Sequence, residues 1–65
     1  MEIFAKKLRE LRVARGLSER ELAGRLGFGV QTVKNYERGV SVPRVSRFMK
    51  ICDFFEVSPH YLLGV

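Results

Sequence analysis

The sequence is poor in the residues that build disulfides and metal sites, with one cysteine, Cys52, and one histidine, His60. A single cysteine excludes an internal disulfide, and one cysteine with one histidine cannot supply the four ligands of a structural zinc site. Such low cysteine usage is typical of a reducing compartment. Neither residue has a partner that suggests nucleophilic or metal chemistry, so we interpret both as structural. The sequence therefore predicts no catalytic residue, no metal and no cofactor.

Long hydrophobic runs are also missing. No uninterrupted apolar run approaches the roughly 20 residues that a membrane-spanning helix needs. The first ten residues, MEIFAKKLRE, are amphipathic and lack the apolar block of a signal peptide. There is no repeat, no low-complexity stretch and no linker, and no segment alternates as a β-strand does. We expect a soluble cytoplasmic protein, without membrane contact, in which residues 1–65 form one domain.

Positive charge is what the sequence has in excess. Twelve Lys and Arg residues against seven Asp and Glu residues leave a net charge of +5. In so short a chain this imbalance favours acidic partners, nucleic acid first among them. Positive charge that only keeps a protein soluble would give the same number. Charge alone therefore leaves both interpretations open.

Helical periodicity, with glycine and proline at the boundaries, predicts an all-α chain of five short helices. Two helix starts have strong local signals. Ser18 with Glu21 three residues later is a capping box, and Ser58 followed by Pro59 is typical of a first helical turn. The predicted helices are residues 2–15, 19–26, 30–38, 44–55 and 59–63.

Apolar residues at helical spacing predict which side of each helix is buried. In the predicted helix 44–55 this stripe consists of Val45, Phe48, Met49, Cys52 and Phe55. The predicted inner residues of the first two helices are Phe4, Leu8, Leu11, Leu22, Ala23 and Leu26.

The second and third predicted helices meet the requirements of a helix-turn-helix, the motif that places its second helix in the major groove of DNA. Only a few residues around Gly27 join them, and this glycine tolerates the positive φ that the turn requires. Ala23 is small enough for a close crossing of the two helices. Phe28, Val33 and Tyr36 are placed to brace the second helix from behind.

Five stretches carry a resemblance that covers nearly the whole chain, from about residue 4 to residue 64. They are LRELRVARGLS, ELAGRLG, TVKNYERG, the proline of SVP, and FFEVSPHYLLG. With them the chain resembles the Cro/repressor-type helix-turn-helix family, also called the XRE family. The resemblance implies a compact five-helix bundle of the lambda-repressor-like type that binds operator DNA, commonly as a symmetric dimer. It makes residues 19–38 the motif and 30–38 the recognition helix.

The same resemblance gives roles to exposed residues of the recognition helix. Gln31 and Asn35 lie one turn apart, and either amide can form two hydrogen bonds to adenine. Lys34 can donate to guanine or reach a phosphate, and Val30 can touch a thymine methyl. Outside this motif, polar residues on one side of a helix are usually just solvated.

Further residues match family positions that contact phosphates, which set the register of a protein on DNA without reading its sequence. At two of them, Val40 and Ser41, the expected donors are backbone N–H groups. These phosphate positions are Ser18, Arg20, Thr32, Arg38, Val40, Ser41 and Arg44.

One acidic residue of the predicted recognition helix points inward. Glu37 lies on the side of Val33, where an unpaired carboxylate is costly. Family position pairs Glu37 with Arg12 of the first helix in a largely buried salt bridge.

Some positions depart from the usual family pattern. Glu19 stands where many members have a glutamine that touches DNA, and its carboxylate repels phosphate. Gly29 replaces the common serine or threonine cap, and Val30 replaces a frequently polar reader. Glu56 stands where glycine or asparagine often ends the fourth helix.

The sequence therefore predicts a transcriptional regulator, a repressor, that binds double-stranded operator DNA sequence-specifically as a homodimer at the nucleoid. The alternative is a protein-interaction module of antitoxin or antirepressor type, in which apolar residues of the last two helices meet a partner. Phe54 motivates this alternative, and Phe54, Val57 and the helix 59–63 are also the candidates for the dimer interface. No nucleophile–base pair, metal cluster or phosphate-binding loop supports an enzyme.

Overall fold

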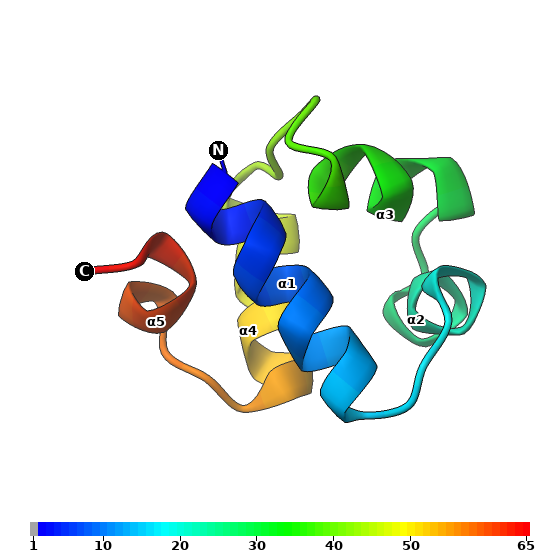
Figure 1. Ribbon diagram of the computed structural model, residues 1–65, viewed down its shortest axis with the longest axis horizontal. Helices are drawn as coiled ribbons and strands as arrows, with labels where there is room; N and C mark the ends of the chain where they lie inside the picture. The colour runs from blue at the N-terminus through cyan, green and yellow to red at the C-terminus, as the bar shows by residue number, and fades with distance from the viewer. Residues whose placement is uncertain (1) are drawn as a thin grey trace.

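The computed structural model describes residues 2–65, so Met1, which the predicted domain includes, lies outside the described residues. In Figure 1, α1 crosses the front of the molecule between α5 on one side and α2 with α3 on the other, and α4 lies behind it. The fold is all-helical within this range, which confirms the predicted fold class. The five helices are α1 (Glu2–Ala14), α2 (Glu19–Leu26), α3 (Val30–Glu37), α4 (Val45–Phe55) and α5 (Pro59–Leu63).

Local capping explains where the short helices begin and end. Ser18 Oγ accepts the Glu21 N–H at 3.0 Å, and a Glu21 carboxylate oxygen accepts the Ser18 N–H at 2.8 Å, which is the predicted capping box. Gly27 ends α2 in a left-handed conformation, with φ of 76°. Ser58 Oγ caps α5 by accepting the Tyr61 N–H. None of the helices within residues 2–65 is long and apolar enough to cross a membrane.

All five helices contribute apolar side chains to one core. The Phe4 ring lies 6.3 Å from the Tyr36 ring and 5.8 Å from the Phe48 ring, so it joins α1 to α3 and α4. Burial of each large side chain stabilises the fold by roughly 1.5–3 kcal/mol. The buried cluster consists of Phe4, Leu8, Leu22, Ala23, Leu26, Val33, Tyr36, Ile51, Cys52, Phe55 and Leu62.

The predicted apolar stripe of α4 is wrong at two positions. Val45 is 77% exposed and Met49 is 39% exposed, whereas Ile51, absent from the predicted stripe, is fully buried. The side chains that reach the core are those of residues 48, 51, 52, 54 and 55. The core reaches α4 only from Phe48 onward, so Val45 at the start of the helix is left exposed.

Three predicted boundaries move by one residue. The first helix ends at Ala14 instead of residue 15. The third helix ends at Glu37 instead of residue 38, because Gly39 turns the chain with φ of 73° and the Val40 N–H bonds back to the Asn35 carbonyl at 3.0 Å. The fourth helix begins after Arg44, which is an extended N-cap and not the first helical residue.

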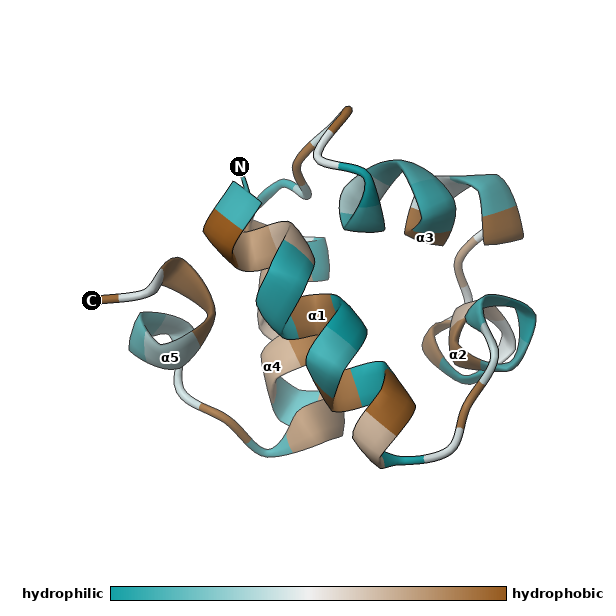
Figure 2. Ribbon diagram, viewed as in Figure 1, coloured by the Kyte–Doolittle hydropathy of each residue, from teal (hydrophilic) through white to brown (hydrophobic). Residues whose placement is uncertain are grey.

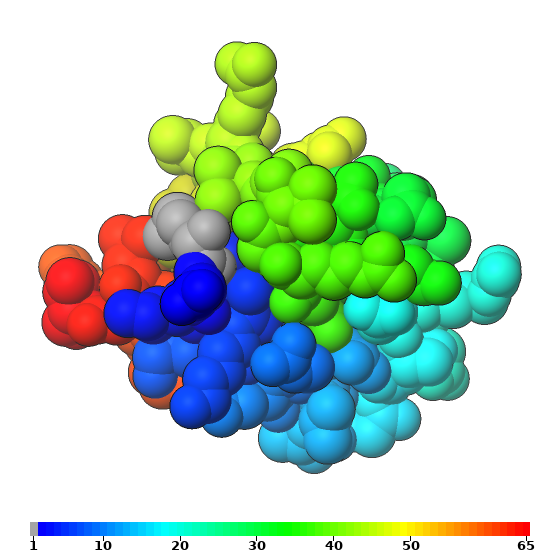
Figure 3. All heavy atoms as spheres, turned by 45° about the horizontal axis from the view of Figure 1, so that its top comes forward, coloured from blue at the N-terminus to red at the C-terminus, as the bar shows by residue number. Residues whose placement is uncertain are grey.

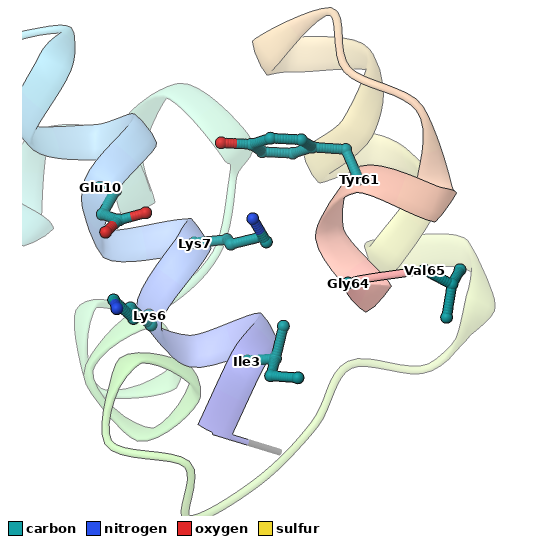
Figure 4. Close-up of a pocket in the computed structure, with 7 residues that line it drawn as sticks. All are labelled: Ile3, Lys6, Lys7, Glu10, Tyr61, Gly64 and Val65. Carbon is teal, nitrogen blue, oxygen red and sulfur yellow. The ribbon is translucent and has the colours of Figure 1, made fainter.

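α5 packs against α1 at the end of the molecule away from α2 (Figure 1). The Lys7 ammonium group lies 4.4 Å from the centre of the Tyr61 ring, and Figure 4 shows the two side chains facing each other. A Cβ atom on Gly64 would lie 2.6 Å from the Ile3 side chain. Glycine at this left-handed position therefore allows the end of α5 to approach α1 closely.

Glu56, which ends α4, is the only non-glycine residue in 2–65 with a positive φ, 57°. A left-handed conformation costs an L-residue roughly 1–2 kcal/mol. Glycine avoids this cost, but it loses more conformational entropy on folding, so the net gain in stability is smaller. We expect Glu56→Gly to raise the free energy of unfolding by about 0.5–1 kcal/mol and the melting temperature by a few degrees. Thermal denaturation followed by circular dichroism measures this. Glu56→Ala keeps the strain and should gain nothing; equal melting temperatures for both variants would contradict the prediction.

Candidate nucleic-acid interface

α2 and α3 pack against each other across a tight turn that has the predicted features. The left-handed Gly27 reverses the chain, and the Phe28 N–H then donates to the Ala23 carbonyl at 2.9 Å. Ala23 is buried, as is Val33 on the inner side of α3. The Phe28 ring packs edge-on against Tyr36 at 6.4 Å. The turn, the small residue and the apolar brace therefore occur together.

A buried ion pair holds α3 against α1. The Glu37 side chain accepts two hydrogen bonds from Arg12, from Nε at 2.7 Å and from Nη2 at 3.0 Å. Arg12 Nη1 also donates to the Leu17 carbonyl in the α1–α2 loop at 2.8 Å, and Arg9 donates to the Glu37 carbonyl at 3.3 Å. One guanidinium group thus connects α1, the α1–α2 loop and α3.

Arg12 faces the negative charges of two glutamates, Glu37 and Glu19. The pKa of Arg12 is raised because it hydrogen-bonds to Glu37 and faces the charges of Glu37 and Glu19, against the opposing effect of burial. Glu19 is half-buried. Its negative charge is the smallest of the influences that set the pKa of Arg12.

The outer side of α3 is polar, as Figure 2 shows by its teal colour. Gln31, Lys34 and Asn35 share this side at helical spacing, with Gln31 exposed and the other two half-buried. Val30, the predicted contact of a thymine methyl, is half-buried and packs against the core. Gln31 Nε2 donates to Asn35 Oδ1 at 3.0 Å. The bond holds the two amides side by side and leaves an acceptor oxygen on Gln31 and an amino group on Asn35 unused by it.

Beside this side of α3 lies a surface hollow of about 490 Å³, between α3 and the start of α4. It brings together four residues that the family resemblance assigned one by one, three to phosphate contacts and one to base reading. Two basic side chains and three hydroxyl groups of serine and threonine line it, which suits an oxyanion of the DNA backbone. The polar lining residues other than Tyr36 are Thr32, Asn35, Ser41, Arg44, Ser46 and Arg47.

Arg47 is a candidate residue that the sequence analysis missed. Its guanidinium group lies 5.0 Å from the centre of the Phe28 ring and donates to the Tyr36 hydroxyl at 3.3 Å. Lys50, one turn later, lies 5.7 Å from the centre of the same ring. The spacing of Arg44, Arg47 and Lys50 along one helix was a signal in the sequence that could have found them.

Two of the expected phosphate donors are engaged within the protein. The backbone N–H groups of Val40 and Ser41 both point at the Asn35 carbonyl, at 3.0 and 3.4 Å. They close the end of α3, whose last carbonyls need donors. In Figure 3 the loop that follows α3, in yellow-green, lies at the projecting edge of the molecule. The side chain of Ser41, which is exposed, remains available there.

The remaining predicted phosphate residues lie at helix ends. Ser18 and Arg20 are exposed at the start of α2, and Arg38 is exposed at the end of α3. The Ser18 N–H and Oγ are engaged in the capping box, which lowers the pKa of Glu21 because its carboxylate accepts the Ser18 backbone N–H. The donors at this end that the capping box does not use are the Ser18 hydroxyl hydrogen and the backbone N–H groups of Glu19 and Arg20.

The hollow between α1 and α5 does not gather the predicted site residues. A hollow of about 520 Å³ lies between α1 and α5 (Figure 4), and its lining contains none of them. Within residues 2–65, no three His, Cys, Asp or Glu side chains are grouped so that they could hold a metal ion. Burial raises the pKa of the Cys52 thiol, which keeps it protonated near neutral pH.

Comparison with known proteins agrees with this geometry. The sequence pattern of the helix-turn-helix family matches residues 8–62. The chain is 36% identical over 55 residues to the cryptic phage CTXphi transcriptional repressor RstR of Vibrio cholerae, covering 85% of this chain and 50% of RstR. It is 36% identical over 61 residues to the HTH-type transcriptional regulator ImmR of Bacillus subtilis strain 168, covering 94% and 48%. The chain spans about half the length of these curated relatives, and no solved structure matches it significantly.

Loss of Arg12 should destabilise the fold, because the buried Glu37 carboxylate would lose its partner. We expect Arg12→Ala to lower the free energy of unfolding by about 3–5 kcal/mol, a large part of the total for a domain of this size. Urea and thermal denaturation measure the loss. The double variant Arg12→Met/Glu37→Leu removes both charges and should recover most of the stability. If it is no more stable than Arg12→Ala, the loss comes from packing and not from the stranded charge.

Proposed function

Because the chain belongs to the helix-turn-helix family, which its match over residues 8–62 shows, we propose that it is a sequence-specific DNA-binding transcriptional repressor. Residues 1–65 act as one DNA-binding domain, with the motif at 19–38, and the protein works at the nucleoid in the cytoplasm. The names of both relatives support regulation of transcription, and that of RstR supports repression. The observation that carries the proposal is the polar side of α3 next to a hollow lined by arginine and hydroxyl groups.

Base reading falls to four residues of α3, the helix that enters the major groove. Gln31 donates one amide hydrogen to Asn35 and keeps an oxygen and a second hydrogen, the pair that adenine N6 and N7 require. Asn35 keeps its two amino hydrogens as donors to a neighbouring base. Lys34 donates to guanine or to a phosphate, and Val30 contacts a thymine methyl.

Phosphate contacts flank the reading helix on both sides. Thr32, Ser41, Arg44 and Arg47 hold a phosphate at the hollow between α3 and α4. Arg44 and Arg47 lie beside the helix that reads bases, so that their electrostatic attraction brings this surface to the DNA. The other contacts come from the helix ends, at Ser18, Arg20 and Arg38.

The protein binds its operator as a homodimer, with no metal and no cofactor. One eight-residue α3 reaches only a few base pairs, and two copies on neighbouring half-sites multiply the specificity. The alternative, a protein-interaction module that uses Phe54, is less well supported. Phe54 is half-buried, its ring packs edge-on against Phe55 at 5.0 Å, and the Arg15 guanidinium group lies 5.3 Å from it.

The proposed reading side of α3 is tested by Gln31→Ala/Asn35→Ala. Duplexes selected from random sequence by the wild-type chain serve as probes, with random competitor DNA. A bidentate contact contributes about 1–3 kcal/mol, so the double variant should bind selected duplexes at least tenfold more weakly while its binding to random DNA is unchanged. Glu10→Ala, an exposed change on α1, is the control. Retention of both affinity and sequence preference in the double variant would exclude these two residues as the readers.

The proposed phosphate contacts are tested by the salt dependence of binding. Arg44→Ala and Arg47→Ala should each make the slope of log affinity against log salt shallower by about 0.9, the value for one phosphate, without changing sequence preference. Lys7→Ala removes the same charge beside α5 and should leave the slope almost unchanged. An Arg47→Ala slope equal to that of Lys7→Ala would mean that Arg47 contacts no phosphate. Melting curves check that each variant is folded.

A further inference from the structure

Two aromatic residues hold the side chain of Arg47 beside the hollow between α3 and α4. The guanidinium group lies 5.0 Å from the centre of the Phe28 ring, and Arg47 Nη1 donates to the Tyr36 hydroxyl at 3.3 Å. Arg47 is exposed, and an exposed arginine without such contacts samples many rotamers. Its two aromatic contacts therefore restrict a side chain that would otherwise be free, at the edge of the hollow that it lines.

The two rings that hold Arg47 are themselves fixed by the core. Tyr36 is only 4% exposed, and its ring lies 6.3 Å from that of Phe4. Phe28, in the turn after Gly27, packs edge-on against Tyr36, and the planes of the two rings meet at 89°. Although Tyr36 is buried, it belongs to the lining of the hollow. The position of Arg47 is thus tied to the packing of α3 and of the α2–α3 turn.

The first turn of α4 is an unfavourable place for a positive charge. Arg47 is the third residue of the helix, that turn contains no acidic residue, and the N-terminal end of a helix favours anions over cations. Arg44 at the N-cap adds a second positive charge, and the Lys50 ammonium group, 5.7 Å from the centre of the Phe28 ring, adds a third. The negative face of the ring attracts Arg47 and Lys50. A bound anion would balance these charges further.

The aromatic support leaves most donors of Arg47 available to such an anion. A guanidinium group has five N–H donors, and the bond to Tyr36 uses one of them. The Phe28 ring attracts the cation electrostatically and contains no oxygen or nitrogen acceptor. The remaining donors of Arg47 can hold a phosphate by two parallel hydrogen bonds, the geometry that distinguishes arginine from lysine.

We propose that Phe28 and Tyr36 are positioning residues for DNA binding, which hold Arg47 ready to bind a phosphate. The inference rests on the proposed function, because the phosphate is that of the DNA backbone. Ordering one long side chain during binding weakens affinity about two- to tenfold. Here Arg47 is already restrained in the folded chain, so this loss is avoided. Phe28 and Tyr36 thus strengthen binding although neither carries a charge or reads a base.

The test measures binding of Phe28→Leu and Tyr36→Phe, each alone and combined with Arg47→Ala, in the 65-residue chain. Selected duplexes are the probes, at several salt concentrations. Each single variant should bind about two- to tenfold more weakly at every salt concentration, with an unchanged slope because Arg47 keeps its charge. In the Arg47→Ala background the same changes should weaken binding no further. Phe28→Tyr retains a ring and should restore the wild-type affinity.

The control background is Lys7→Ala, which removes a positive charge beside α5. Phe28→Leu and Tyr36→Phe should weaken binding there by the same factor as in the wild type. Damage to the core would give equal losses in all three backgrounds, so the comparison separates positioning from stability. Tyr36→Phe also keeps the buried ring, and melting curves check that every variant is folded.

A second measurement needs no DNA. NMR relaxation of the Arg47 Nε–H group reports how mobile the guanidinium group is. It should be restrained in the wild type and in Phe28→Tyr, and more mobile in Phe28→Leu. Equal mobility in the wild type and in Phe28→Leu would overturn the proposal, because the ring would then not restrain Arg47.

The binding data decide the proposal as follows. Losses in the single variants that vanish with Arg47→Ala support it. Single variants that bind like the wild type, or that lose the same factor with and without Arg47, overturn the role of Phe28 and Tyr36 and leave the proposed function intact. Full affinity and an unchanged slope in Arg47→Ala also overturn it, since Arg47 then contacts no phosphate. A wild-type chain that selects no duplex overturns the proposed function, and this role with it.

Discussion

The Arg12–Glu37 ion pair is the interaction on which the position of α3 depends. α3 has eight residues, too few to be stable alone, and its N-cap Gly29 offers no side-chain hydrogen bond. Its position must therefore come from packing and from this pair. Burial of two charges is costly, but here both carboxylate oxygens and three guanidinium nitrogens have partners. The pair therefore specifies one orientation of α3 relative to α1.

That orientation decides which side chains of α3 face the solvent. Val33 and Tyr36 lie on the inner side of α3 and are buried in the core. Gln31 and Asn35 therefore lie on the outer side, where their side-chain amides hydrogen-bond to each other. The 39–44 loop then connects the polar side of α3 with the hollow at the start of α4, and Asn35 belongs to both. A chain of this size thus presents two adjacent polar surfaces.

Local signals in the sequence were enough to predict most of the helices and their ends. The Ser18–Glu21 capping box and the Ser58 cap form as predicted, because each needs only residues within one turn of helix. The family resemblance placed α3 and paired Arg12 with Glu37, and the structure contains that pair. The assignment of residues to bases and phosphates stays a prediction, since it depends on a partner outside the chain.

The sequence by itself determined the five helices, the turn between α2 and α3 and the polar side of α3, because spacing and capping are properties of neighbouring residues. Only the tertiary structure decided how far the core extends along α4, which leaves Val45 exposed and buries Ile51. It also decided that the Val40 N–H closes α3 and that Arg47 joins the hollow. Periodicity indicates which residues share a side of a helix, but the neighbours of that side are set by how the chain folds back on itself.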